Sequence, residues 1–307
     1  MLSSIEAVNT HCYHMEDSHL KRIFIFLLLS VPLSIVFAQE KILLFGVPWY
    51  VPEIFTLGAF GVLVFFERGS FDIYRRRNIF FWALSLMTLG FLVSIFSNDI
   101  SLHGYGRLKS WFLFPLAYGM MLSFSLRKKL LSLEDVLRAV FLGGVLIGIS
   151  TLMSIASGGA FSYDHRLHGF FSSPNHLAML LGTAVLMGIF QCVSLRVKQG
   201  KGRAAICSGV LFLLALLLLT QSYMVIFSLM TAVGIWTAKY RKYLSQRQIL
   251  RFFFGLMLFL GILLSLSGDK WQGIIMQEDR SSLSSREMIW TAALKMIRDH
   301  PFIGIGP

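Results

Sequence analysis

Long apolar runs are the feature that most constrains the fold of this chain. A helix needs about 20 mostly apolar residues to cross a bilayer, and by that measure the sequence contains about nine such runs. They cover residues 23–38, 50–66, 79–97, 108–124, 139–157, 175–194, 205–220, 222–238 and 252–267. Hydrophobic residues make up 55% of the 307-residue chain and charged residues only 14%, which excludes an ordinary soluble globular protein. The sequence predicts an all-α integral membrane protein.

The positions of the runs divide the chain into three predicted parts. We expect a tail over residues 1–22, a polytopic transmembrane domain over 23–267, and the start of an extracytoplasmic helical loop over 268–307. Pro48 and Pro52 interrupt the approach to the second run. The seventh and eighth runs are separated only by the residues TQSY, which predicts a tight hairpin or a broken helix.

Basic residues predict the orientation in the membrane. Most of the 28 Lys and Arg residues fall in the N-terminal tail and in every second connection between the predicted spans. The positive-inside rule therefore places the N-terminus in the cytoplasm and residues 268–307 outside it. This topology accounts for the net charge of +12. The expected partner is the lipid bilayer, and nucleic acid is not an expected partner.

Small residues in the apolar runs suggest packing inside one chain. Gly144 and Gly148 form a GxxxG pair in the fifth run. Such pairs let two membrane helices approach closely, and here we expect them to pack helices of the same chain. Cys192 and Cys207 lie in or beside apolar runs and predict no disulfide framework.

The loop before the sixth run carries the first candidate functional residues. Arg166 could extend harmlessly to the membrane surface or meet an anionic head group. Asn175, at the start of the run, could cap the helix or bind substrate. His165 and His168 could bind a metal together with Asp164, but a further ligand is missing. The His-rich stretch HCYHMEDSH in the tail also lacks zinc-site spacing, so we expect no metal.

The last segment, SSREMIWTAALKMIRDH, predicts a polar helix with an unusual arginine. Ser284 and Glu287 form a capping box, which predicts that the helix starts with Ser284 as its N-cap. Arg286 then falls in the first turn, in the middle of the apolar face. A cation there opposes the helix dipole, so we expect it to hold a phosphate-like anion together with the helix N-terminus. Pairing with a buried carboxylate is the alternative.

Two segments resemble one known family. The pattern SREMIWTAALKMIRDHPFIGIGP resembles the periplasmic-loop motif of the O-antigen ligase and O-antigen polymerase family, with Arg, a Trp four residues on, His-Pro and Gly-x-Gly. The stretch RLHGFFSSPNHLAML resembles a second family segment, with Arg, Gly, Phe and a Pro-Asn that opens a membrane helix. The order of the two segments and the predicted topology also match the family.

The resemblance implies a metal-independent glycosyltransferase of the bacterial inner membrane. Such enzymes use no cofactor and move a glycan from undecaprenyl diphosphate to an acceptor on the periplasmic side. The acceptor is the lipid A core for a ligase and a saccharide repeat unit for a polymerase. The resemblance makes Arg286 the matching diphosphate ligand and catalytic residue. Arg166 and Asn175 match family positions and are expected to bind substrate.

Two departures from the family pattern keep other readings open. Family members carry a T-x-S-R pattern after the seventh span, whereas this chain has Tyr223 in place of that arginine. The sequence ends at Pro307, before the expected loop histidine and last spans, and His300 belongs to the His-Pro that closes the helix. We therefore expect a truncated form. Whether this form is active is left open by the sequence. The alternatives are a catalytically inactive membrane remnant or scaffold, and a polytopic transporter, which would carry polar residues at mid-membrane depth.

Overall fold

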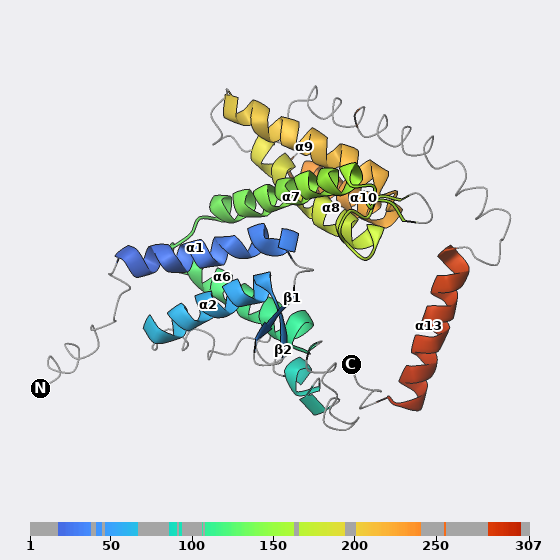
Figure 1. The fold of residues 1–307 in the computed structure, drawn as a ribbon, viewed down its shortest axis with the longest axis horizontal. Coiled ribbons are helices and arrows are strands. Elements are labelled where there is room, and N and C mark those ends of the chain that lie inside the picture. Colours follow the sequence, from blue (N-terminus) through green and yellow to red (C-terminus); the bar gives the residue numbers. More distant parts are fainter. Residues whose placement is uncertain are drawn as a thin grey trace, which may run out of the picture. The chain divides into compact units, whose positions relative to one another are not determined.

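The computed structural model divides the chain into two compact units. Unit 1 comprises Met1–Val31, Glu40–Ser132 and Ser284–Pro307, and unit 2 comprises Pro32–Gln39 and Leu133–Leu283. Figure 1 shows the helices and strands of both, and each unit is treated below by itself. The residues described are 18–37, 41–44, 47–66, 86–90, 92–93, 106, 108–162, 166–193, 201–240, 255 and 282–301.

Three apolar helices pack together among the described residues of unit 1. They are α1 (Ser18–Ser34), α2 (Val51–Phe66) and α6 (Phe114–Arg127), and α1 enters unit 2 at its last turn. A π-helix, η3 (Lys109–Leu113), leads directly into α6. The buried side chains between these helices are Phe24, Leu28, Ala59, Leu63, Met121 and Phe124, with Leu131 after α6.

A short β-hairpin precedes α2 and corrects the all-α prediction. Strands β1 (Lys41–Leu44) and β2 (Val47–Tyr50) are antiparallel, with Lys41 opposite Tyr50. Pro48 lies in β2, and Pro52 is the second residue of α2, where the missing N–H removes no helical hydrogen bond. The two prolines therefore shape a hairpin and a helix start, and the predicted second span is helical from Val51.

One buried ion pair joins the hairpin, α2 and η3. The Oε2 atom of Glu53 accepts the backbone N–H of Tyr50 at 3.0 Å, as the third helical residue does in a capping box. The same oxygen accepts Nζ of Lys109 at 2.7 Å. Nζ also lies 4.4 Å from the centre of the Trp49 ring, within range of a cation–π contact. The charge of Lys109 is thus compensated inside unit 1.

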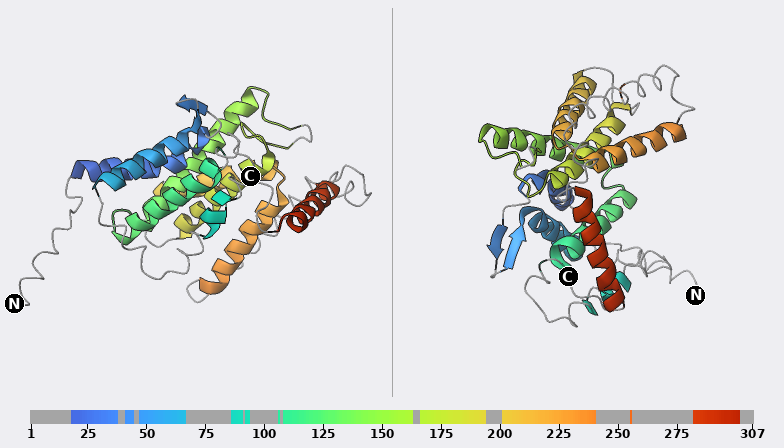
Figure 2. Two further views of the ribbon diagram at one scale, coloured as in Figure 1. Left: turned by 90° about the horizontal axis from the view of Figure 1, so that it is seen from below. Right: turned by 90° about the vertical axis from the view of Figure 1, so that its right-hand side faces the viewer.

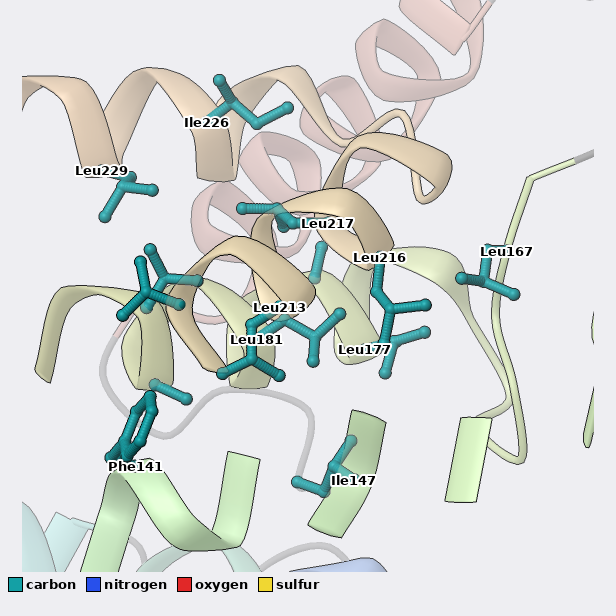
Figure 3. Packing of buried hydrophobic residues seen from close by; sticks show 14 of the residues in the cluster. Phe141, Ile147, Leu167, Leu177, Leu181, Leu213, Leu216, Leu217, Ile226 and Leu229 are labelled. Carbon is teal, nitrogen blue, oxygen red and sulfur yellow. The ribbon is translucent and has the colours of Figure 1, made fainter. Parts of the chain in front are cut away.

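The described residues of unit 2 form a bundle of four helices in which α8 is central. The helices are α7 (Leu133–Ala156), α8 (Pro174–Val193), α9 (Lys201–Leu219) and α10 (Tyr223–Tyr240), and a 3₁₀ turn, η2 (Ile35–Phe37), packs on α7. α8 packs against α7, α9 and α10. Figure 3 shows the shared core, whose labelled residues are Phe141, Ile147, Leu167, Leu177, Leu181, Leu213, Leu216, Leu217, Ile226 and Leu229.

Glycines allow α7 to approach its neighbours. A Cβ on Gly144 would collide with Cβ of Ala184 on α8, and a Cβ on Gly148 would lie 2.6 Å from Cε1 of Phe212 on α9. These contacts confirm that the GxxxG pair packs helices of one chain. α8 and α9 also bring the Sγ atoms of Cys192 and Cys207, both free cysteines, to 2.9 Å from each other.

The connection between α9 and α10 breaks the helix sharply. α9 ends at Leu219, and α10 begins at Tyr223. Gln221 between them has a φ of 49°, a left-handed conformation that ends a helix. Figure 2 shows the two helices leaving this connection in different directions. Of the two predicted readings of TQSY, the structure therefore favours a broken helix.

Three helices among the described residues are long and apolar enough to cross a membrane. They are Leu133–Ala156, Pro174–Cys192 and Gly202–Leu219, and the shorter apolar helices are Val51–Val64 and Tyr223–Thr237. These helices support an integral membrane protein. The total of nine spans stays a prediction. The ninth predicted run and residues 1–17 lie outside the described residues except for residue 255, and the third run is described only at 86–90 and 92–93.

Candidate functional site

The connection between α7 and α8 is held firmly against the end of α9. Phe161 and Leu167 form an antiparallel bridge, and the backbone N–H of Ser162 donates to the carbonyl of Arg166 at 2.9 Å. Leu167 is fully buried, and its N–H donates to the carbonyl of Leu219 at 3.0 Å. This bond satisfies a carbonyl of the last turn of α9, which has no partner within its own helix. The segment therefore has a fixed backbone at its arginine.

A glycine allows the chain to turn directly after this segment. The N–H groups of His168 and Gly169 both donate to the carbonyl of Ala160, at 2.9 and 3.1 Å. Gly169 has a φ of 58°, in the left-handed region that residues with a Cβ rarely adopt. A Cβ there would also lie 3.0 Å from Oγ1 of Thr151 on α7. The turn therefore requires glycine for two separate reasons.

The side chain of Arg166 joins the two predicted substrate-binding residues. Its Nη2 donates to Oδ1 of Asn175 at 2.9 Å, and its Nε donates to the carbonyl of Thr220 at 3.0 Å. Oδ1 of Asn175 also accepts Oγ–H of Ser222 at 3.1 Å. The structure thus brings Arg166 and Asn175 together and adds two groups from the α9–α10 connection that sequence reasoning missed. The sequence did offer a signal for Thr220 and Ser222, since both are polar residues between two apolar helices.

Asn175 is not the cap of α8. The cap is Ser173, whose Oγ accepts the backbone N–H of Asn175 at 3.2 Å. The side chain of Asn175 is directed instead to Arg166 and Ser222. Of the two readings of Asn175 that the sequence allowed, capping is therefore wrong, and the amide takes part in a polar cluster. We call Arg166, Asn175, Thr220 and Ser222 the arginine cluster.

The electrostatics of the arginine cluster suit an anion. Arg166 is half-buried, and both of the oxygens just described are neutral, so these bonds orient its guanidinium without cancelling its charge. Asn175 is the second residue of α8, and Ser222 directly precedes α10. The N-termini of two helices, where backbone N–H groups favour negative charge, thus flank the cluster.

Tyr223 stands where the family pattern has its second arginine. It is the first residue of α10, directly follows Ser222 of the arginine cluster, and is half-buried. A phenol can donate one hydrogen bond but carries no positive charge at neutral pH. The helix start at this position therefore lacks the cation that the family pattern would supply.

The last helix begins earlier than predicted. α13 runs from Ser282 to Asp299, so Ser284 lies inside it and Arg286 is its fifth residue, beyond the first turn. The capping box would make Ser285 the first helical residue, so the prediction is wrong by three residues, because the run SSLSS offers several serines as caps and Leu283 favours helix. The side chain of Arg286 lies outside the described residues, and its predicted direction stays a prediction. Trp290 on the apolar face is 66% exposed.

The sequence predicts no metal site. The described residues contain no group of three or more His, Cys, Asp or Glu side chains that could hold a metal ion. Asp164, His165 and the His-rich tail lie outside the described residues. Metal independence therefore stays a prediction.

Comparison with known proteins gives one finding. The family model described as O-antigen ligase matches residues 208–307. This range includes the α9–α10 connection and α13, whereas Arg166 and Asn175 lie outside it. No curated protein and no solved structure matches the chain. The match confirms the resemblance seen in the sequence and supports an O-antigen ligase family membrane protein.

Proposed function

We propose that this protein transfers a glycan from undecaprenyl diphosphate to a lipid A core or saccharide acceptor on the periplasmic side of the bacterial inner membrane. The observation that carries the proposal is the orientation of Arg166 by two neutral oxygens, those of Thr220 and Asn175. The O-antigen ligase match over residues 208–307 supports the same reaction class. The predicted topology supports the periplasmic side.

The chemistry needs a cation close to the leaving group. When the glycan leaves undecaprenyl diphosphate, negative charge grows on the diphosphate oxygens. A fixed guanidinium stabilises that charge, since its planar N–H groups pair with phosphate oxygens and need no reorganisation during the reaction. In the proposal Arg166 binds the diphosphate, and Asn175 and Ser222 keep Arg166 in place. The role of Arg286 as a diphosphate ligand stays a prediction from the family resemblance.

A second candidate function is a catalytically inactive membrane scaffold. Tyr223 favours it, because this residue leaves the start of α10 without the cation of the family pattern. A scaffold would bind the lipid-linked donor without turning it over. Both candidate functions therefore predict binding of the lipid-linked donor, and only the enzyme predicts transfer of the glycan.

The test measures binding of undecaprenyl diphosphate to the full chain in lipid nanodiscs. Arg166→Ala is expected to weaken binding by roughly 10- to 150-fold, the equivalent of about 1.5–3 kcal/mol for a hydrogen bond to a charged group. Arg166→Lys should recover only part of the loss, because an ammonium cannot make paired bonds.

Arg138→Ala is the matched control. Arg138 lies on α7 in the same unit, is exposed, and pairs with Glu134 four residues away. This variant should bind like the wild type. If Arg166→Ala also binds undecaprenyl diphosphate like the wild type, the proposed diphosphate site is wrong. Binding without glycan transfer by the wild type would favour the scaffold.

A further inference from the structure

Two cysteines of unit 2 meet where α8 and α9 pack together. Cys192 is the next-to-last residue of α8, and Cys207 is the seventh residue of α9. Their Sγ atoms lie 2.9 Å apart, and either thiol can donate a hydrogen bond to the other. Both are free cysteines, and both are partly exposed. The pair therefore consists of two thiols in direct contact, one from each helix.

The backbones of α8 and α9 also come close beside this pair. Gly188 lies one helical turn before Cys192, and a Cβ on it would lie 2.5 Å from Cγ2 of Val210 on α9. Val210 follows Cys207 by three residues, so the two contacts fit one antiparallel pairing of the helices. A disulfide needs two Cβ atoms about 3.8 Å apart, which only closely packed helices offer. The glycine contact therefore supports, independently of the sulfurs, that a bond fits between α8 and α9 here.

A shared metal ion explains the two thiols less well. Two sulfurs on one tetrahedral zinc each lie about 2.3 Å from the metal and about 3.8 Å from each other. The Sγ atoms of Cys192 and Cys207 are closer than that. Among the residues that the structure describes, no group of three or more His, Cys, Asp or Glu side chains is placed to hold a metal ion. The geometry therefore favours a bond between the sulfurs themselves.

The predicted topology places the pair at the reducing side of the membrane. The stretch between the two cysteines carries four basic residues, Arg196, Lys198, Lys201 and Arg203. Such basic stretches stay in the cytoplasm. Cytoplasmic glutathione keeps thiols reduced, and disulfides that form there are usually transient and redox-sensing. At this end of the helices we therefore expect a bond only when the cytoplasm becomes oxidising.

We propose that Cys192 and Cys207 are a redox-sensitive modification site, which closes to a disulfide under thiol-oxidising stress and joins α8 to α9 covalently. The oxidant that the site takes is a small-molecule disulfide of the glutathione class. This inference does not depend on the proposed function. It concerns a different end of the helices from the arginine cluster and uses none of its residues.

The reaction is thiol–disulfide exchange in two steps. One protein thiol, as its thiolate, attacks a sulfur of the small disulfide, which forms a mixed disulfide and releases one small thiol. The second protein thiolate attacks the cysteine sulfur of the mixed disulfide and releases the other small thiol. The protons of the two cysteines end on the two released thiols. The protein is thus oxidised by two electrons, and the small disulfide is reduced by two.

The short distance between the sulfurs favours the closing step. Once one cysteine carries the small thiol, the other attacks within the same molecule and has no entropy of encounter to lose. The Sγ atoms lie 2.9 Å apart, and a disulfide bond is about 2.05 Å long, so closure needs only a small shift. Excess small thiol reverses both steps, which makes the modification reversible.

The bond would join the two helices that carry parts of the arginine cluster. Asn175 is the second residue of α8, and α9 ends directly before Thr220, whose carbonyl accepts Nε–H of Arg166. At about 1.5 Å per residue, Cys192 lies roughly 26 Å along α8 from Asn175. Oxidation would therefore fix α8 against α9 at the end of both helices that is far from the cluster.

The first experiment tests whether the bond closes in the full chain in lipid nanodiscs. Cys12→Ser is the background, so that two of the three cysteines remain. The protein is treated with oxidised or reduced glutathione, denatured and labelled with a maleimide. Intact mass spectrometry should show two labels after reduction, and no label and the loss of two hydrogen atoms after oxidation. Two free thiols after oxidation, or a lasting glutathione adduct, would overturn the proposal.

Cys207→Ser combined with Leu211→Cys is the matched control. It keeps one cysteine on each helix but moves the thiol of α9 by one turn, to a side chain that is 68% exposed. Under the same conditions this variant should lose most of the internal disulfide. Equal disulfide yields would show that the contact between Cys192 and Cys207 does not direct the bond, which contradicts the proposal.

The second experiment tests whether the bond joins the helices firmly. Oxidation should raise the temperature of thermal unfolding by roughly 5–10 °C, because a bond across a loop of this length restricts the unfolded chain. The double variant Cys192→Ser and Cys207→Ser should unfold at the same temperature with and without oxidant. An unchanged or lower temperature for the oxidised protein would mean that the bond does not hold α8 to α9.

The third experiment asks when the bond forms in cells that express the chain. Thiols are trapped with acid and alkylated before treatment with a thiol oxidant, during treatment and after recovery. Cys192 and Cys207 should be reduced at first, joined during treatment and reduced again after recovery. A disulfide in untreated cells would show a permanent structural bond, and no disulfide during treatment would show two inert thiols. Either result would overturn the redox-sensitive site.

Discussion

Lys109 in unit 1 and Arg166 in unit 2 are both held in a defined geometry, and the two cations differ in what holds them. In unit 1, Lys109 pairs with a carboxylate at 2.7 Å, and its side chain is 14% exposed. In unit 2, Arg166 bonds a backbone carbonyl and an amide oxygen and is half-buried. A buried cation with a counter-charge holds elements of the fold together. The oxygens of Thr220 and Asn175 are neutral, so these two bonds fix the direction of the Arg166 guanidinium and supply no counter-charge themselves.

The largest expected effect comes from removing the counter-charge in unit 1. Glu53→Gln keeps the size of the side chain and an oxygen for the N–H of Tyr50, but it removes the carboxylate that pairs with the largely buried Lys109. We expect a loss of about 3–5 kcal/mol in the free energy of unfolding, typical of breaking a buried pair from one side. Denaturant unfolding in detergent measures it.

Glu134→Gln is the control for this experiment. It breaks the exposed i,i+4 pair with Arg138, which should contribute no more than about 0.5 kcal/mol. Equal unfolding midpoints for the two variants would mean that the Glu53–Lys109 pair does not stabilise unit 1. The contrast between the two cations would then be lost.

In unit 2 the opposite change, adding a carboxylate beside the cation, tests the same difference between Lys109 and Arg166. Asn175→Asp places a carboxylate 2.9 Å from Nη2 of Arg166, where the amide oxygen now lies. The guanidinium would then face a carboxylate, and the new charge would repel a diphosphate. We expect undecaprenyl diphosphate to bind about 10- to 150-fold more weakly, the equivalent of about 1.5–3 kcal/mol.

Asn175→Ala separates the effect of the added charge on binding from the effect of losing a hydrogen bond. It removes the amide oxygen without adding a charge, so binding should fall less than with Asp. Calorimetric titration with undecaprenyl diphosphate measures the affinity of both variants. Equal affinity of Asn175→Asp and the wild type would show that the charge of Arg166 does not matter for the ligand.

A smaller effect is expected from the turn that supports Arg166. Gly169→Ala forces a Cβ into a left-handed conformation and to 3.0 Å from Oγ1 of Thr151. We expect a cost of about 1–2 kcal/mol in stability, measured by thermal unfolding, together with weaker donor binding.

Gly61→Ala in α2 is the matched control in unit 1. A Cβ at Gly61 meets nothing within 4 Å, and alanine is the better helix former by about 0.5–1 kcal/mol. This variant should be neutral or slightly stabilising. Should the two variants unfold at the same temperature, the turn of unit 2 would not depend on its glycine.

Apolar periodicity predicted several helices well. The helices α2, α7, α8, α9 and α10 lie close to predicted runs, because a membrane helix needs a continuous apolar stretch whatever it packs against. α7 begins at Leu133, earlier than its run, since Glu134 and Asp135 favour a helix N-terminus although they interrupt hydropathy. Boundaries thus depend on capping, which hydropathy does not describe.

Long-range polar pairs could not be predicted in the same way. Lys109 and Glu53 are 56 residues apart, and Arg166 and Thr220 are 54 apart, so only helix packing brings them together. Arg166 and Asn175 were found because they match a family segment. Their partners Thr220 and Ser222 lie in TQSY, a stretch that was read only as a connection between two helices. The β-hairpin was missed because KILL is apolar and adjoins an apolar run.

The bond from Arg166 to Thr220 has a consequence for movement. The carbonyls of Leu219 and Thr220, at the end of α9, are held by residues 167 and 166 of the preceding connection. A swing of α10 about the break at Gln221 would pull on the same peptide groups. The direction of that helix and the orientation of the guanidinium therefore depend on the same two peptide groups.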